Sequence, residues 1–175
     1  LGLAAALATN APSGSVRVFG TPAEEAVGGK VIMTGAGLFA GIDVAMGAHP
    51  GPSDATCPTA AGSGSSLACE EVRIAYHGRT AHAAADPYNG INALNAIIEV
   101  FNGINALRQH VRSDARLHGI ITHGGQAPNV VPDYARAEFY VRAATVEYMN
   151  QLIEQVRRIA EGAALITGAR LEFEV

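Results

Sequence analysis

The sequence predicts an α/β protein in two parts: a piece of parallel β-sheet with its helix, followed by an α+β unit. Three observations support this class. Apolar strand-like runs flank a helical segment near the N-terminus, a stretch rich in Gly, Pro, Ser and Ala separates the two parts, and helical stripes alternate with strand-like runs in the second half. The 175 residues suffice for one ordinary domain or two small ones.

The first part, residues 1–66, reads as strand, helix and strand. "VRVFG" at 16–20 and "GIDVAMGAHP" at 41–50 are apolar and strand-like, and "EEAVGGKVIMTGAGLF" between them reads as a glycine-interrupted helix. "GPSDATCPTAAGSGSS" at 51–66 has no periodicity and therefore predicts a linker. We place the domain boundary there.

The second part, residues 67–175, has the order β-α-β-β-α-β, which is the ferredoxin-like pattern. "VRIAYHG", "RLHGIITHGG", "YARAEFYVRA" and "RLEFEV" are the strands. Thr145 is the expected N-cap of the second helix, over 146–165. The first helix carries an apolar stripe formed by Ile91, Leu94, Ile97, Ile98, Phe101, Ile104 and Leu107.

Charge and cysteine content narrow the functional classes. With 12 basic and 16 acidic residues and no obvious basic run, the chain is a poor match to a nucleic-acid partner. No stretch is long and apolar enough to suggest a membrane span. Cys57 and Cys69 have no CxxC spacing, which is typical of a reducing compartment and favours a cytoplasmic location.

Polar side chains follow both predicted strands of the first part. Glu24 and Glu25 come after one strand and His49 ends the next. Because the carboxyl ends of parallel strands share one edge, we expect these side chains to lie together. The glutamates could simply lie at the N-terminus of the following helix, where the helix dipole stabilises negative charge. His49 could be a hydrogen-bonded structural residue. Alternatively, one carboxylate and the imidazole bind a divalent metal while the other carboxylate moves protons.

A second group of polar residues lies in the second part. His82, Asn129 and Arg142 sit near loops or on the polar side of a strand. Each has an ordinary structural interpretation: a solvated turn residue, an Asx-turn former, and a sheet-face charge paired with Glu138. Together, an imidazole, a carboxamide and a guanidinium could hold an amide oxygen and a carboxylate.

Four linked stretches carry a family resemblance. "FGTPAEEAVGGK", "AHPGP", "YHGRTAHAAADPYNGINAL" and "HGIITHGGQAPNVVPDYARAEFYVRA" resemble, in order and spacing, the metal-dependent amidohydrolases and peptidases. That family includes aminoacylases, hippurate hydrolases, auxin-conjugate hydrolases, aminobenzoyl-glutamate hydrolases and a dipeptidase-like branch. The resemblance implies a parallel-sheet metallopeptidase catalytic domain interrupted by a ferredoxin-like lid that forms a homodimer. The implied activity is hydrolysis of an amide bond in N-acyl amino acids or dipeptide-like substrates.

The resemblance also implies roles for single residues. Glu24 matches the general base, and Glu25 and His49 match metal ligands of a site that takes two ions, zinc or alternatively manganese or cobalt. His82 matches a catalytic histidine that reaches the active site, commonly that of the partner subunit, and polarises the scissile carbonyl. Asn129 and Arg142 match lid residues that hold the substrate, with Arg142 the better match for its carboxylate.

The chain departs from the family pattern at both ends. The family's upstream ligand motif should precede Leu1, and its last histidine ligand should follow Val175. We therefore expect this chain to be the middle of a longer hydrolase, inactive in isolation. The alternative is a non-catalytic dimerisation or carboxylate-binding module that retains the lid fold.

Overall fold

The chain divides into two compact units, Leu1–Pro58 and Thr59–Val175. The structure is a computed structural model, and each unit is considered by itself. It describes residues 5, 8–9, 14–23, 28–46 and 66–175. The predicted linker at 51–66 lies almost wholly outside these ranges, so the predicted boundary there stays a prediction.

In the first unit, helix α2 (Gly29–Gly35) lies where the sequence predicts a glycine-interrupted helix. The rings of Phe19 and Phe39 pack edge to face, with centroids 4.8 Å apart. The two predicted strands are not found: residues 16–20 and 41–46 are described and form no strand. A strand requires a hydrogen-bonded neighbour, and the described residues of this unit provide none.

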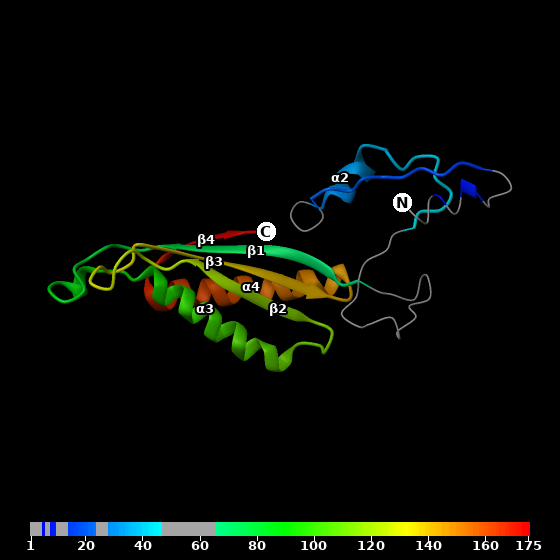
Figure 1. Ribbon diagram of the computed structural model, residues 1–175. Helices are drawn as coiled ribbons and strands as arrows, with labels where there is room; N and C mark the ends of the chain where they lie inside the picture. The colour runs from blue at the N-terminus through cyan, green and yellow to red at the C-terminus, as the bar shows by residue number, and fades with distance from the viewer. Residues whose placement is uncertain (1–4, 6–7, 10–13, 24–27, 47–65) are drawn as a thin grey trace, which may run out of the picture. The chain divides into compact units, whose positions relative to one another are not determined.

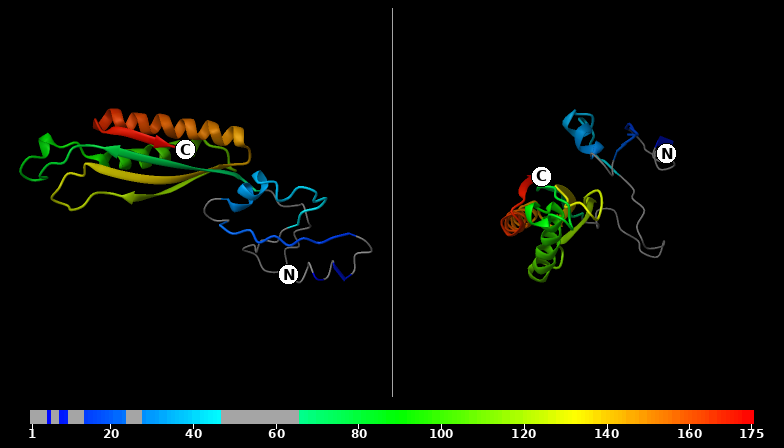
Figure 2. Two further views of the ribbon diagram at one scale, coloured as in Figure 1. Left: turned by 90° about the horizontal axis from the view of Figure 1, so that it is seen from above. Right: turned by 90° about the vertical axis from the view of Figure 1, so that its left-hand side faces the viewer.

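The second unit has the predicted order β-α-β-β-α-β. Its four strands form one antiparallel sheet in the order β2-β3-β1-β4, and both long helices cover the same face of it (Figures 1 and 2). The elements are β1 (Ala68–His77), η1 (Pro87–Asn89), α3 (Ala93–Leu107), η2 (Arg108–His110), β2 (Arg116–His123), β3 (Tyr134–Ala143), α4 (Val146–Thr167) and β4 (Arg170–Glu174).

The core lies between the sheet and the two helices, because the strands alternate small or apolar residues with polar ones. On β3 the inward set is fully or almost fully buried: Ala135, Ala137, Phe139, Val141 and Ala143. On β1 the inward set is Val72, Ile74 and Tyr76, each at 0 % exposure. The period-two pattern therefore gives this sheet one apolar face and one polar outer face.

The apolar stripe predicted for helix α3 meets the core everywhere except at Ile98. Ile97 and Ile104 are fully buried, and four further members pack against the core: Ile91, Leu94, Phe101 and Leu107. Ile98 is 43 % exposed, whereas Ala93 and Ala96 are fully buried. Small side chains at these positions let the helix approach its neighbours closely. Gly103 shows the same effect, since a Cβ built there would lie 2.5 Å from a methyl group of Ile159 on α4.

Helix α4 begins as predicted. The Thr145 hydroxyl accepts a hydrogen bond from the Tyr148 backbone N–H at 3.2 Å, which satisfies one of the free donors of the first turn. The helix ends at Thr167, and the cap residue Gly168 has a φ of 74°, the left-handed conformation that glycine adopts easily.

The outer face of the sheet carries charged side chains, and several of them form ion pairs. The hydrogen bond from His77 on β1 holds the pKa of Glu172 on β4 below its usual range. Three ion pairs lie along these strands: Arg73–Glu71 at 2.8 Å, Arg136–Glu138 at 2.8 Å and His77–Glu172 at 2.9 Å. Among the described helices, none has the length and hydropathy needed to cross a membrane.

Candidate functional site

Two loops meet at one end of the sheet, where β1 ends and β3 begins. We call this region, loops 78–92 and 124–133, the tip; its first loop projects beyond the strands in Figures 1 and 2. Backbone hydrogen bonds tie the two loops together: Gly78 N–H to Asp133 O (2.7 Å), Ala83 N–H to Asn129 O (2.9 Å), Val131 N–H to Ala81 O (2.9 Å) and Ala93 N–H to Pro132 O (2.8 Å). Each bond fixes an otherwise free loop, so the side chains of the tip are held on a defined backbone.

Gly78 makes the first turn of the tip possible. A Cβ on this residue would lie 2.0 Å from the carbonyl oxygen of Ile91 and 3.2 Å from the Ala93 nitrogen. The loop closes on itself at the same place, because Arg79 and Ile91 exchange two backbone hydrogen bonds of 2.9 Å. A side chain at position 78 would push these bonds apart.

His82 lies in the tip with a defined tautomer. Its Nδ1 accepts hydrogen bonds from the backbone N–H groups of Ala84 and Ala85, at 3.3 and 3.1 Å. In the neutral ring the proton must therefore sit on Nε2. His82 is exposed, so this Nε2–H can donate a hydrogen bond to a ligand. The turn that the sequence allowed for His82 is present, and it orients the ring.

Asn129 lies directly beside His82. Its backbone oxygen accepts from Ala83, and the next residue, Val130, pairs with His82 as an isolated bridge. Its carboxamide is exposed and forms no hydrogen bond with any residue that the structure describes. The tip thus presents an imidazole N–H and a carboxamide together, which suits the binding of a carbonyl oxygen or an oxyanion.

Arg142 is at the opposite end of the sheet. It pairs with Cys69 near the start of β1, whereas the tip follows His77 at the end of the same strand. At a rise of about 3.3 Å per residue, the two positions are roughly 25 Å apart. The structure therefore brings together two of the three predicted substrate-binding residues and leaves the third far from them.

The ordinary structural interpretation of Arg142, an ion pair with Glu138, is wrong. Glu138 binds the Nη2 of Arg136 instead, at 2.8 Å. The guanidinium of Arg142 lies 5.7 Å from the ring centroid of Tyr140, and no carboxylate in the described ranges pairs with it. An exposed, unpaired guanidinium can bind a carboxylate with two parallel hydrogen bonds.

Sequence reasoning missed Arg116 on β2. The sheet register places Arg116 directly opposite Arg142 on the same outer face. Like charges in this position repel each other. The alternation within "RLHGIITH" could have placed Arg116 on the polar face, but the neighbouring strand could not be identified without the register.

The predicted metal-binding residues Glu25 and His49, and the predicted base Glu24, lie outside the described residues. Within the ranges that are described, no group of three or more His, Cys, Asp or Glu side chains is placed to hold a metal ion. The roles of Glu24, Glu25 and His49 therefore stay predictions.

Comparisons with known proteins agree with this fold. One curated relative is an Xaa-Arg dipeptidase of Mus musculus, 38 % identical over 176 residues and 99 % of this chain. Another is a p-aminobenzoyl-glutamate hydrolase polypeptide of Escherichia coli, 36 % identical over 160 residues and 91 % of this chain. A crystal structure of an aminobenzoyl-glutamate utilization protein from Klebsiella pneumoniae has a TM-score of 0.55 and 25 % identity, over 62 % of this chain and 28 % of that one.

The chain is much shorter than these relatives. It spans 39 % of the length of the mouse protein and 32 % of the Escherichia coli protein. Residues 70–167, which include the whole tip and Arg142, match the model of the peptidase dimerisation domain. This match covers more than half of the chain, and the protein therefore belongs to the peptidase dimerisation domain family.

Proposed function

We propose that this chain is part of a metal-dependent hydrolase that cleaves an amide bond in an N-acyl amino acid or a dipeptide. The family match supports this proposal, and so do the relatives that are named as a dipeptidase and an aminobenzoyl-glutamate hydrolase. In this proposal residues 67–175 are the lid and dimerisation domain. Residues 1–66 are a piece of a parallel-sheet catalytic domain with its linker.

The proposed metal ligands are Glu25 and His49. A carboxylate and an imidazole are ligand types that zinc accepts, and manganese or cobalt can replace it in such a set. Two ligands are fewer than a zinc site requires, so the proposed binuclear centre needs further ligands from the whole protein. When bound, such ions polarise a carbonyl group and lower the pKa of water. Glu24 is the proposed general base beside them.

The observation that carries the proposed substrate site is the distance between its predicted residues within one sheet. The tip, with His82 and Asn129, and Arg142 lie roughly 25 Å apart, at a rise of about 3.3 Å per residue along β1. One small substrate cannot contact both ends of the same protomer. A homodimer related by two-fold symmetry can bring the tip of one protomer to the Arg142 of its partner.

Each of these side chains then has a distinct task. The Nε2–H of His82 donates to the carbonyl oxygen as negative charge develops on it, and Asn129 positions the same group. Arg142 binds the carboxylate of the amino-acid half of the substrate. Loss of a single oxyanion donor costs about 2.7–4 kcal/mol in the transition state, so His82 should affect turnover strongly.

The test uses the protein at its natural full length. Glu24→Gln removes the proposed base but keeps the shape of the side chain, so we expect turnover of N-acyl amino acids and dipeptides to fall almost to zero while the metal stays bound. His49→Ala should lower the metal content, measured by elemental analysis. Full turnover in the Glu24→Gln protein would rule out the base assignment.

The same measurements decide between the enzyme and the alternative function. A full-length protein that binds no metal and hydrolyses no amide would be a non-catalytic dimerisation or carboxylate-binding module. The cytoplasmic location stays a prediction.

A further inference from the structure

Three arginines line one pocket at the start of β2. Arg108 is the first residue of η2, directly after α3. Arg112 follows η2, and Arg116 is the first residue of β2. The pocket has a volume of about 310 Å³. Its other lining residues are Val111, Ser113, Ala115 and Leu117, so no acidic side chain lines it.

Neighbouring groups hold all three guanidinium groups in place. Arg108 donates through Nε and Nη2 to the carbonyl oxygen of Leu117, at 3.2 and 2.6 Å, and through Nη1 to Asn105. Arg116 donates through Nη1 to the carbonyl oxygens of Ser113 and Ala115, both at 2.7 Å. These contacts fix the donors on the backbone of the pocket itself.

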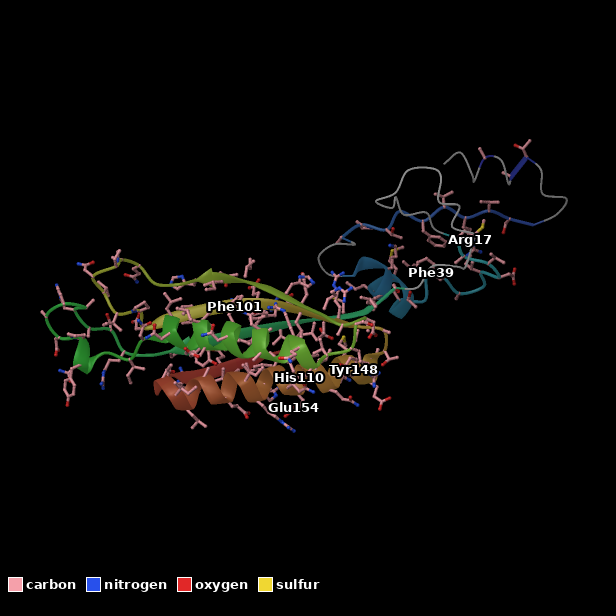
Figure 3. All side chains as sticks on the ribbon, turned by 90° about the horizontal axis from the view of Figure 1, so that it is seen from below. Arg17, Phe39, Phe101, His110, Tyr148 and Glu154 are labelled. Carbon is pink, nitrogen blue, oxygen red and sulfur yellow. The ribbon has the colours of Figure 1, made fainter. Side chains whose placement is uncertain are left out.

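The third guanidinium lies on an aromatic ring. The Arg112 guanidinium carbon is 4.1 Å from the ring centroid of Tyr148, a cation–π contact. The Tyr148 hydroxyl also accepts the backbone N–H of Arg112, at 3.0 Å. Figure 3 shows Tyr148 at the start of α4, at the same end of the domain as His110 in η2.

The hydrogen-bond acceptors of Arg108 and Arg116 are all neutral. In the part of the chain that the structure describes, none of the three forms an ion pair. Asp114 lies in the same segment, but its carboxylate accepts from the Ala144 N–H at 3.1 Å and does not line the pocket. Three positive charges without an acidic partner are unusual in a chain whose formal net charge is −4.

Several donors of the pocket have no protein acceptor. A guanidinium has five N–H groups. The side-chain N–H groups of Arg112 form no hydrogen bond, and Arg116 uses only Nη1, with no acceptor for its Nε or Nη2 among the described residues. These guanidinium groups are fixed by the protein and still have free N–H donors. They can therefore bind an anion that has several oxygens and more than one negative charge.

We propose that this pocket binds a tetrahedral oxyanion of the phosphate or sulfate type. Such an ion offsets most of the charge of the three arginines and accepts from the free donors of Arg112 and Arg116, while Arg108 mainly adds charge. A carboxylate, with two oxygens and one charge, satisfies fewer of them. The site is at the end of the sheet opposite to the tip and does not depend on the proposed hydrolase activity.

The test is a titration of the ¹⁵N-labelled chain with inorganic phosphate, followed by NMR at constant pH and at an ionic strength kept constant with sodium chloride. We expect saturable shifts of the Nε–H signals of Arg112 and Arg116. Arg112→Gln and Arg116→Gln should each weaken binding by about tenfold or more, because each removes charge-assisted hydrogen bonds. Arg158→Gln, at a helix position 74 % exposed, removes the same charge elsewhere and should change nothing.

Three results would overturn the proposal: shifts that do not saturate, equal weakening by the Arg158 control, or equally tight binding of acetate. Circular dichroism shows whether each variant folds. If Arg116→Gln fails to fold, Arg112→Lys takes its place, since it keeps the charge over Tyr148 and loses the planar fork. Binding to that variant as tight as to the wild type would also contradict the proposal.

Discussion

The two ends of the sheet in the second unit differ in how their polar side chains are held. At the tip, backbone hydrogen bonds fix two loops, which present the side chains of His82 and Asn129 together. At the other end, which we call the arginine end, cations gather without carboxylate partners: Arg108, Arg112, Arg116 and Arg142. Between the two ends, Arg73 pairs with Glu71 and Arg136 pairs with Glu138 on the outer face.

The two ends should therefore contribute differently to the stability of the domain. The tip is tightly bonded, so changes there should destabilise the domain. The arginine end holds like charges in register, so removal of a charge there should stabilise the domain slightly. Unneutralised charge that costs stability is typical of a surface kept for a ligand.

The largest effect on stability is expected at the tip. Gly78→Ala forces a Cβ into the Ile91 carbonyl, 2.0 Å away, and should lower the free energy of unfolding by about 2–3 kcal/mol. Gly162→Ala is the matched control, because a Cβ there meets nothing within 4 Å in the middle of α4. It should raise the free energy of unfolding by about 0.5–1 kcal/mol. Urea unfolding measures both, and equal effects would contradict the account of the tip.

A smaller effect is expected at Tyr76, near the end of β1. Its hydroxyl donates to the Ala160 carbonyl on α4 at 2.7 Å inside the core. Tyr76→Phe removes this bond and should cost about 1 kcal/mol in chemical unfolding at neutral pH.

Tyr76 should also make the stability of the domain depend on pH. Burial raises the pKa of Tyr76 above its unfolded value of about 10. The neutral hydroxyl therefore contributes its full stability below about pH 10, and this contribution is lost as the pH rises above that value. The wild type should lose more stability than Tyr76→Phe between roughly pH 9 and pH 11, a window set by the tyrosine reference value of about 10. Parallel alkaline profiles would show that Tyr76 is not the group responsible.

The smallest effect, with the opposite sign, is expected at the arginine end. Arg142→Gln removes the like-charge pair with Arg116 and should stabilise the domain by about 0.2–1 kcal/mol at low salt. The gain should shrink as salt screens the charges. Thermal unfolding at two salt concentrations measures it. Destabilisation by Arg142→Gln at low salt would mean that Arg142 has a structural partner.

The sequence was sufficient for the fold of the second unit because its patterns are local. Period-two alternation located β3, and Thr145 marked the start of α4. The predicted strand at 16–20 failed because strand formation depends on a neighbouring strand, which a local pattern does not reveal.

The candidate site was predictable in its residues but not in its arrangement. His82, Asn129 and Arg142 were singled out one by one, and nothing in their spacing shows that β1 runs its full length between them. The tautomer of His82 depends on the backbone of Ala84 and Ala85, which a sequence does not display. The pocket of three arginines was missed because those residues are four apart along an irregular segment.

The most direct test of the divided site is a mixing experiment on the full-length protein. His82→Ala and Arg142→Ala homodimers should each be nearly inactive. When the two are unfolded together and refolded at equal amounts, half of the dimers are mixed and one of their two sites is intact, so about a quarter of wild-type turnover should return. Recovery near that level would support a site shared between protomers. No recovery, with mixed dimers shown to form, would contradict it.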